Sequence, residues 1–182
     1  MKKILLSLPL LILSINSITQ ELPEMVIGKA SSGPGIDYIF EGAIKDDVSP
    51  VGFFLAEDQS DIHIEVLANW NDESPRGSVV GGFVAYLDIK TTLTNQKTNQ
   101  SKSVILKPHL NMSDNLHYAQ NLKLPGSTKD LYTVSFAINP PREGLIGMHL
   151  DWREEVGEEI AVTSVFTFTD LDFYKISQAT RR

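Results

Sequence analysis

The sequence predicts an all-β protein, an immunoglobulin-like antiparallel β-sandwich, and three observations support this fold class. From Ile36 onward the apolar residues alternate with a period of two, which is typical of half-buried strands and not of amphipathic helices. The apolar stretches are rich in β-branched and aromatic residues, which pleated sheets favour. Clusters of Asn, Gly and Pro separate these stretches, so about seven or eight short antiparallel strands are expected.

The most regular alternation covers residues 83–93, where Leu87 and Ile89 share one face with other apolar residues and more polar residues occupy the opposite face. Residues 132–138 alternate in the same way, and residues 161–168 have the β-branched and aromatic content of a strand. No helix longer than two turns is predicted. Shorter strands are expected at residues 37–43, 52–56, 61–68, 103–106 and 172–176.

Residues 1–19 have the layout of a secretory signal peptide. Two lysines precede the apolar stretch Ile4–Ile15, and small polar residues follow it. A stretch of about twelve apolar residues is too short to span a bilayer, which takes about twenty. We therefore expect cleavage near Thr19 and export to the periplasm. Residues 20–182 are then expected to form a single metal-binding domain, because a chain of this length buries one hydrophobic core.

The composition excludes several classes of protein. The chain contains no cysteine, which excludes disulfide frameworks, thiolate zinc sites, iron–sulfur clusters and blue-copper centres. Its net charge of −7 disfavours binding to nucleic acid or to an anionic membrane surface and suits cations instead. Beyond the signal peptide no segment is apolar enough for membrane insertion. No P-loop, dinucleotide fingerprint, HExxH motif or nucleophile elbow is present, so hydrolase chemistry is not predicted.

The chain has four histidines, and each lies beside another potential metal ligand. In the strand predicted at residues 61–68, apolar residues alternate with His63 and Glu65, so these two side chains project from one face. They lie under about 7 Å apart along a strand, and one metal ion could touch both. An ordinary polar strand face is the alternative interpretation of this pair.

A second group lies in residues 108–118, where His109, Met112 and His117 flank a loop that could bring them together. Imidazole binds copper, iron and zinc, whereas a thioether favours Cu(I), so this combination points toward copper. Met112 could instead fill a gap in the core, which is the commoner role of methionine.

The fourth histidine, His149, follows a Pro-Pro turn and precedes an acidic stretch at residues 153–159. A solvated loop histidine is the simpler interpretation of this residue. The carboxylates that follow His149 either form a solvent-exposed surface or hold a second, harder cation such as iron.

Five fragments in the same order resemble the periplasmic iron-transport protein family, whose members are small copper-binding dimers that accompany membrane iron permeases. No single fragment is specific, and their order along residues 28–176 carries the resemblance. The fragments are SDIHIE, FVAYLDI, KPHLNMSDNLHYAQN, LYTVSFAINPP and GMHLDWREEVG.

The resemblance implies a metal site. The family's strand histidine and the glutamate that follows it correspond to His63 and Glu65, the histidine before a tyrosine to His117, and the late histidine to His149. In the family this last ligand reaches the site across a dimer interface. A homodimer with a symmetric pair of sites is therefore implied.

This chain departs from the family at the methionine ligand. The family's methionine follows a proline, whereas here Pro108 is followed by His109. Either His109 replaces the thioether and makes the site harder, or Met112 takes that place after a local insertion. The second alternative is slightly favoured.

The resemblance also implies a function in high-affinity iron uptake, with copper as the bound cofactor and iron as the cargo handed to an inner-membrane permease. An alternative is a periplasmic copper chaperone or copper-resistance protein, in which copper is the cargo. A third is a metal-free sandwich module for adhesion or scaffolding. A dedicated enzyme is not predicted, apart from a copper-linked change in the oxidation state of iron.

Overall fold

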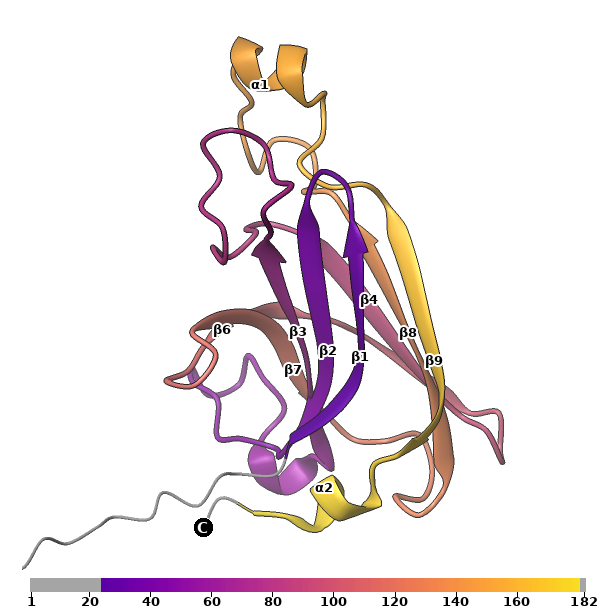
Figure 1. The fold of residues 1–182 in the computed structure, drawn as a ribbon. Coiled ribbons are helices and arrows are strands. Elements are labelled where there is room, and N and C mark those ends of the chain that lie inside the picture. The colour runs from indigo at the N-terminus through magenta and orange to yellow at the C-terminus, as the bar shows by residue number, and fades with distance from the viewer. Residues whose placement is uncertain (1–23, 181–182) are drawn as a thin grey trace, which may run out of the picture.

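Two antiparallel sheets face each other in the computed structural model, which describes residues 24–180 (Figure 1). The five-stranded sheet has the order β1-β2-β3-β7-β6, and the four-stranded sheet has the order β5-β4-β8-β9. This arrangement confirms the predicted all-β sandwich, while the predicted signal peptide lies outside the described residues. The strands are β1 (Glu24–Ser32), β2 (Ile36–Ala43), β3 (Ile62–Trp70), β4 (Asp88–Asn95), β5 (Ser101–Ile105), β6 (Lys107–Leu110), β7 (Leu116–Leu122), β8 (Leu131–Asn139) and β9 (Ser164–Asp172).

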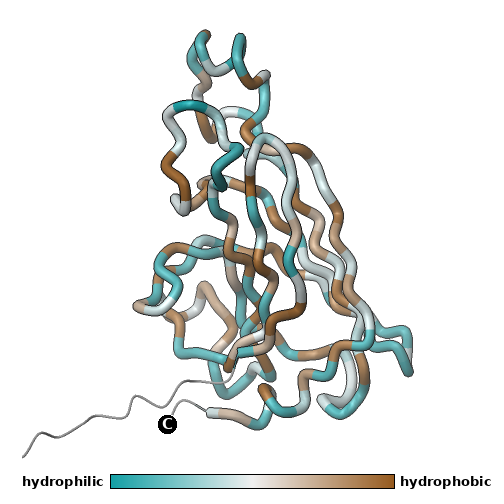
Figure 2. Tube along the Cα trace, in the orientation of Figure 1, coloured by the Kyte–Doolittle hydropathy of each residue, from teal (hydrophilic) through white to brown (hydrophobic). Residues whose placement is uncertain are grey.

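The hydrophobic core lies between the two sheets. The ring of Phe40 on β2 contacts that of Phe136 on β8, with centroids 4.5 Å apart, and that of Phe166 on β9 at 5.4 Å. Alternate residues of β8, from Tyr132 to Ile138, are fully buried, as the pleat requires. Brown residues recur along the strands in Figure 2, whereas the turn between β4 and β5 is hydrophilic. The sheets are therefore joined mainly by aromatic and aliphatic contacts.

Three predicted strands differ in the structure. Only the second half of the strand predicted at residues 83–93 is β4, because Tyr86 adopts a φ of 66° that interrupts an extended chain. Residues 52–56 form an irregular connection, which begins at Gly52 with a φ of 90°. Residues 172–176 end β9 and enter helix α2 (Tyr174–Gln178).

Strands β1, β6 and β7 were not predicted. In β6 and β7 the outer face carries the buried polar residues His109, His117 and Asn121, so the simple alternation of buried apolar and exposed polar residues is lost. Helices are short: α1 (Leu150–Glu155), α2 and the 3-10 turn η1 (Glu57–Gln59). Over residues 24–180, no helix is long and apolar enough to cross a membrane.

The connection between β2 and β3, residues 44–61, partly covers the outer face of the five-stranded sheet, and we call it the roof. The side chain of Asn121 on β7 anchors the roof to the sheet. Its amide nitrogen donates hydrogen bonds to the backbone oxygens of Asp46 and Leu55 at 2.6 and 2.8 Å. Polar side chains on this outer face are therefore buried without belonging to the core between the sheets.

Candidate metal centre

Strand register brings three of the four histidines to one place on the outer face of the five-stranded sheet. His109 of β6 pairs directly with His117 of β7, and His63 of β3 pairs with Asn121 of β7. Residues two or four apart on a strand point the same way, so His117 and Asn121 share a face, as do His63 and Glu65. Ile64 and Tyr118, on the opposite faces of the same strands, belong to the core between the sheets.

One ligand atom from each of His63, His109 and His117 lies within 4.8 Å of the other two. The ring centroids are 5.2 Å apart between His63 and His109, 6.0 Å between His109 and His117, and 6.4 Å between His63 and His117. All three residues are buried, with at most 9% of their surface exposed. Because imidazole nitrogens bind a metal ion at about 2.0–2.1 Å, a small inward shift of the rings would let one ion contact all three.

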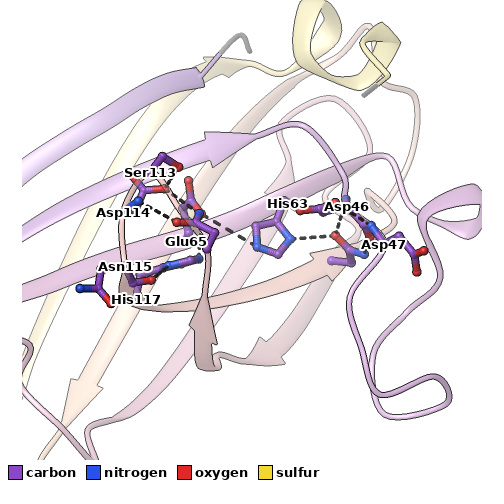
Figure 3. A network of polar contacts seen from close by, with 10 residues as sticks. Asp46, Asp47, His63, Glu65, Ser113, Asp114, Asn115 and His117 are labelled. Carbon is purple, nitrogen blue, oxygen red and sulfur yellow. Dashed lines mark hydrogen bonds and ion pairs between the residues drawn. The ribbon is translucent and has the colours of Figure 1, made fainter. Parts of the chain in front are cut away.

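The ring of His63 is oriented by Asn121. The amide nitrogen of Asn121 donates to two backbone oxygens of the roof, so its Oδ1 is an acceptor. This oxygen lies 2.7 Å from Nδ1 of His63, which must therefore carry the hydrogen. The lone pair of neutral His63 is then on Nε2, which lies 3.9 Å from Oε2 of Glu65 (Figure 3).

His117 has the same tautomer for a similar reason. Its Nδ1 lies 3.1 Å from the backbone oxygen of Asn115, which can only accept, so Nδ1 donates. Its Nε2 lies 3.4 Å from Oε2 of Glu65. When both rings are neutral, two imidazole lone pairs and a carboxylate oxygen face the same region, an arrangement that a cation stabilises.

His109 has a buried ring nitrogen, Nε2, with no hydrogen-bond partner. Burial, and then the neighbouring His63 and His117, lowers the pKa of His109 to about 4, so the ring is neutral near pH 7. The ring of Phe54 packs against it at a centroid distance of 4.9 Å in a T-shaped arrangement. A buried unsatisfied nitrogen costs about 1–3 kcal/mol, and coordination to a metal ion would remove that cost.

Glu65 also belongs to a second group, made of carboxylates. One oxygen from each of Glu24, Glu65 and Asp114 lies within 4.8 Å of the others. Glu41 of β2 pairs with Glu65 in the sheet. Burial, and then the charges of Glu24 and Asp114, raises the pKa of Glu41. This concentration of negative charge makes the region beside the imidazoles favourable for a cation.

A cavity of about 310 Å³ opens onto both groups. The three clustered histidines and the carboxylates of Glu24, Glu65 and Asp114 line it, and residues 46–49 and Phe54 of the roof close it on another side. Figure 3 shows the His63 ring between Glu65 and the Asp46–Asp47 segment. The cavity therefore places nitrogen and oxygen donors next to each other.

Met112 lies outside this arrangement. Its side chain is fully exposed in the turn between β6 and β7 and does not line the cavity. Of the two residues that the sequence offered for the methionine position, the structure brings His109 to the other histidines and leaves Met112 in solvent.

His149 lies elsewhere in the chain. It immediately precedes α1, which Figure 1 places at the end of the molecule away from the β6–β7 turn. There it lines a second cavity of about 680 Å³, together with Trp70 and Trp152. Within one chain, His149 therefore does not join the other three histidines.

Several residues of the centre carried no recognisable signal in the sequence. Asn121, Glu24 and Glu41 reach the centre only through pairing between strands, and Phe54 only through the path of the roof. The one available hint was the weak apolar alternation in residues 107–122, where His109, His117 and Asn121 interrupt the pattern.

One protein family matches most of the chain. The family model described as "Fe2+ transport protein" matches residues 21–174. Among curated proteins, UPF0423 proteins of Brucella abortus (strain 2308) and Brucella melitensis are each 26% identical over 137 residues, which is 74% of this chain and 74% of theirs.

Solved structures share the fold. A copper-bound variant of Campylobacter jejuni P19 matches with a TM-score of 0.69 and 25% identity, over 81% of this chain and 96% of that one. The copper-reconstituted P19 protein matches with a TM-score of 0.68, 25% identity and the same coverage. FetP of uropathogenic Escherichia coli strain F11 has a TM-score of 0.67 and 23% identity, over 81% of this chain and 95% of FetP.

Proposed function

Because this chain belongs to the Fe²⁺ transport protein family, we propose that it is a periplasmic metal-binding protein of iron uptake. In this proposal copper is bound by the clustered histidines, and iron is the cargo delivered to an inner-membrane permease. The signal-peptide layout of residues 1–19 supports export to the periplasm. The observation that carries the proposal is the convergence of three buried imidazoles, one of which has an unsatisfied Nε2.

The donor set fits copper. His63, His109 and His117 offer imidazole nitrogens, and Glu65 offers a carboxylate at the same place, a combination that suits divalent copper. The copper in the P19 structures, which are 25% identical to this chain, supports the choice of metal. Bound copper supplies a one-electron couple, while Asn121 holds the His63 ring in its binding tautomer and Phe54 limits access of water to His109.

Iron would be held beside copper by the oxygen ligands. Glu24, Glu65 and Asp114 form a group of hard donors, which suit iron better than copper. Glu65 belongs to both groups, so a cation at one of them changes the charge felt at the other. In this arrangement Glu65 is the residue that links copper binding to the cargo.

The copper proposal is tested by elemental analysis and copper titration of the purified protein. We expect about one copper per chain, and a loss of at least 100-fold in affinity for His63→Ala and His117→Ala. Lys90→Ala, an exposed change on the other sheet, is the matched control and should leave the affinity unchanged. Wild-type protein that takes up no copper would contradict the proposal and favour the metal-free sandwich.

The iron proposal is tested in cells and on the protein. A deletion strain should grow poorly under iron starvation and normally under copper stress, whereas a copper chaperone or resistance protein would give the opposite result. In the purified protein, Glu24→Gln and Asp114→Asn should weaken Fe²⁺ binding at least tenfold while copper affinity stays within about threefold, because these carboxylates lie outside the imidazole group.

We further infer a homodimer in which His149 of one copy approaches the copper site of the other. Supporting this inference, His149 is remote from the other histidines in its own chain and lines the same cavity as two exposed apolar residues, Val79 and Ile146. His149→Ala should then weaken copper binding although the residue is far from the site of its own chain. Unchanged affinity would remove the reason for proposing this ligand.

A further inference from the structure

We propose that His109 makes the copper site selective for Cu(II), so that the protein holds copper more tightly in the oxidised than in the reduced form. This inference rests on the proposed copper site and extends it by naming the oxidation state and the residue that selects it.

Sulfur donors are absent from the cavity among residues 24–180. The chain has no cysteine, so any sulfur ligand must come from methionine. Met25 is partly buried against the core between the sheets, Met148 lines the cavity beside α1, and Met112 is fully exposed. The donors that line the cavity of the metal centre are therefore nitrogen and oxygen atoms.

This set of donors favours the oxidised ion for two reasons. Cu(I) is soft and is bound best by thiolates and thioethers, whereas imidazole and carboxylate suit Cu(II). The carboxylate of Glu65 lies 3.4 Å from Nε2 of His117, and its negative charge stabilises a divalent ion more than a monovalent one. Both effects lower the reduction potential of bound copper.

His109 is the position at which the donor class is decided. The rings of His63 and His117 are held by hydrogen bonds from Nδ1 to Asn121 and Asn115, whereas Nε2 of His109 is buried without a partner. A methionine at this position would have similar length and could keep the contact with Phe54, because thioethers pack well against aromatic rings. His109→Met therefore exchanges nitrogen for sulfur at one ligand with little change in packing.

The experiment measures the dissociation constants of Cu(I) and Cu(II) for the purified protein by competition with chelators specific for each form. The wild type should bind Cu(II) at least tenfold more tightly than Cu(I). His109→Met should raise the affinity for Cu(I) relative to Cu(II) at least tenfold, which corresponds to about 59 mV in reduction potential for each tenfold change. The Cu(II) electron paramagnetic resonance spectrum should lose the coupling of one ring nitrogen.

Met112→Leu is the matched control and should leave both affinities within about twofold, because this side chain lies in solvent. The inference is overturned if Met112→Leu lowers Cu(I) affinity tenfold, or if the wild type binds Cu(I) more tightly than Cu(II). In both of those cases the proposed copper site survives. A wild-type protein that binds neither form overturns the copper site itself, and circular dichroism of each variant confirms that it is folded.

Discussion

Nδ1 of His63 donates a hydrogen bond to Oδ1 of Asn121 over 2.7 Å, and the same amide holds the roof at Asp46 and Leu55. One side chain therefore connects a histidine of the candidate metal centre to the loop that covers it. Metal coordination makes an imidazole N–H more acidic and strengthens its hydrogen bond, so an occupied centre should hold the roof more firmly.

The first prediction concerns Asn121→Ala. The change removes hydrogen bonds to two backbone oxygens of the roof and to His63, and it should lower the free energy of unfolding by about 2–4 kcal/mol. Hydrogen exchange should accelerate in residues 46–55, and copper affinity should fall about tenfold. Denaturant unfolding, hydrogen exchange and metal titration measure the three effects.

Asn69→Ala is the control for this prediction. Asn69 also donates to a backbone oxygen, that of Gly81, but it lies at the far end of β3 from the centre. It should change neither exchange in residues 46–55 nor copper affinity. Slow exchange in the roof of Asn121→Ala would show that the roof is held by other contacts.

The second prediction concerns access to the centre through Phe54. Its ring packs against His109, and Nζ of Lys107 lies 5.5 Å from its centroid. Phe54→Ala should open the cavity and speed the release of copper to a chelator about tenfold, because water and chelator then reach His109. Stopped-flow absorbance measures the release. Phe53→Ala is the neighbouring control: this side chain is 70% exposed, and its loss should leave the rate unchanged.

The third prediction concerns the stability of the protein at alkaline pH. Burial raises the pKa of Tyr132, whose hydroxyl donates to the backbone oxygen of Ser127 and accepts from Asn95. Because the folded pKa lies above the unfolded value, the hydroxyl contributes its full stability below about pH 10 and loses it as the pH rises further. Tyr132→Phe should cost about 1 kcal/mol at pH 7.

The difference in unfolding free energy between the wild type and Tyr132→Phe should shrink above pH 10, because only the wild type can lose the proton. Urea unfolding at several pH values measures it. A difference that stays constant from pH 7 to pH 11 would contradict the raised pKa. Tyr86→Phe, at an exposed tyrosine, should behave as the wild type.

The fourth prediction concerns the proposed homodimer. Val79 lines the second cavity and is 72% exposed, so Val79→Glu places a charge in the apolar surface expected at the interface. The dimer dissociation constant should rise at least tenfold in analytical ultracentrifugation. Val165→Glu makes the same change on β9, away from that cavity, and should leave the dimer intact. Equal weakening by both variants, or by neither, would place the interface elsewhere.

The sequence by itself determined the fold class and the placement of two candidate ligands, His63 and Glu65. The pleat makes side chains alternate between the two faces of a strand, so a period of two predicts strands, and it puts His63 and Glu65 on one face without knowledge of any other strand. The prediction was less accurate where the backbone is irregular. The apolar pattern of residues 83–93 continues through Tyr86, but the positive φ of this residue interrupts the strand there.

Only the tertiary structure decided which other residues complete the centre. The pairing of β6 with β7 sets His109 opposite His117 and leaves Met112 at the exposed tip, although both candidates lie within four residues of each other in the sequence. Pairing of β3 with β7 brings Asn121 to His63 across 58 residues of chain. Periodicity is a property of one strand, whereas the contacts that build a metal centre depend on register between strands, which local sequence does not specify.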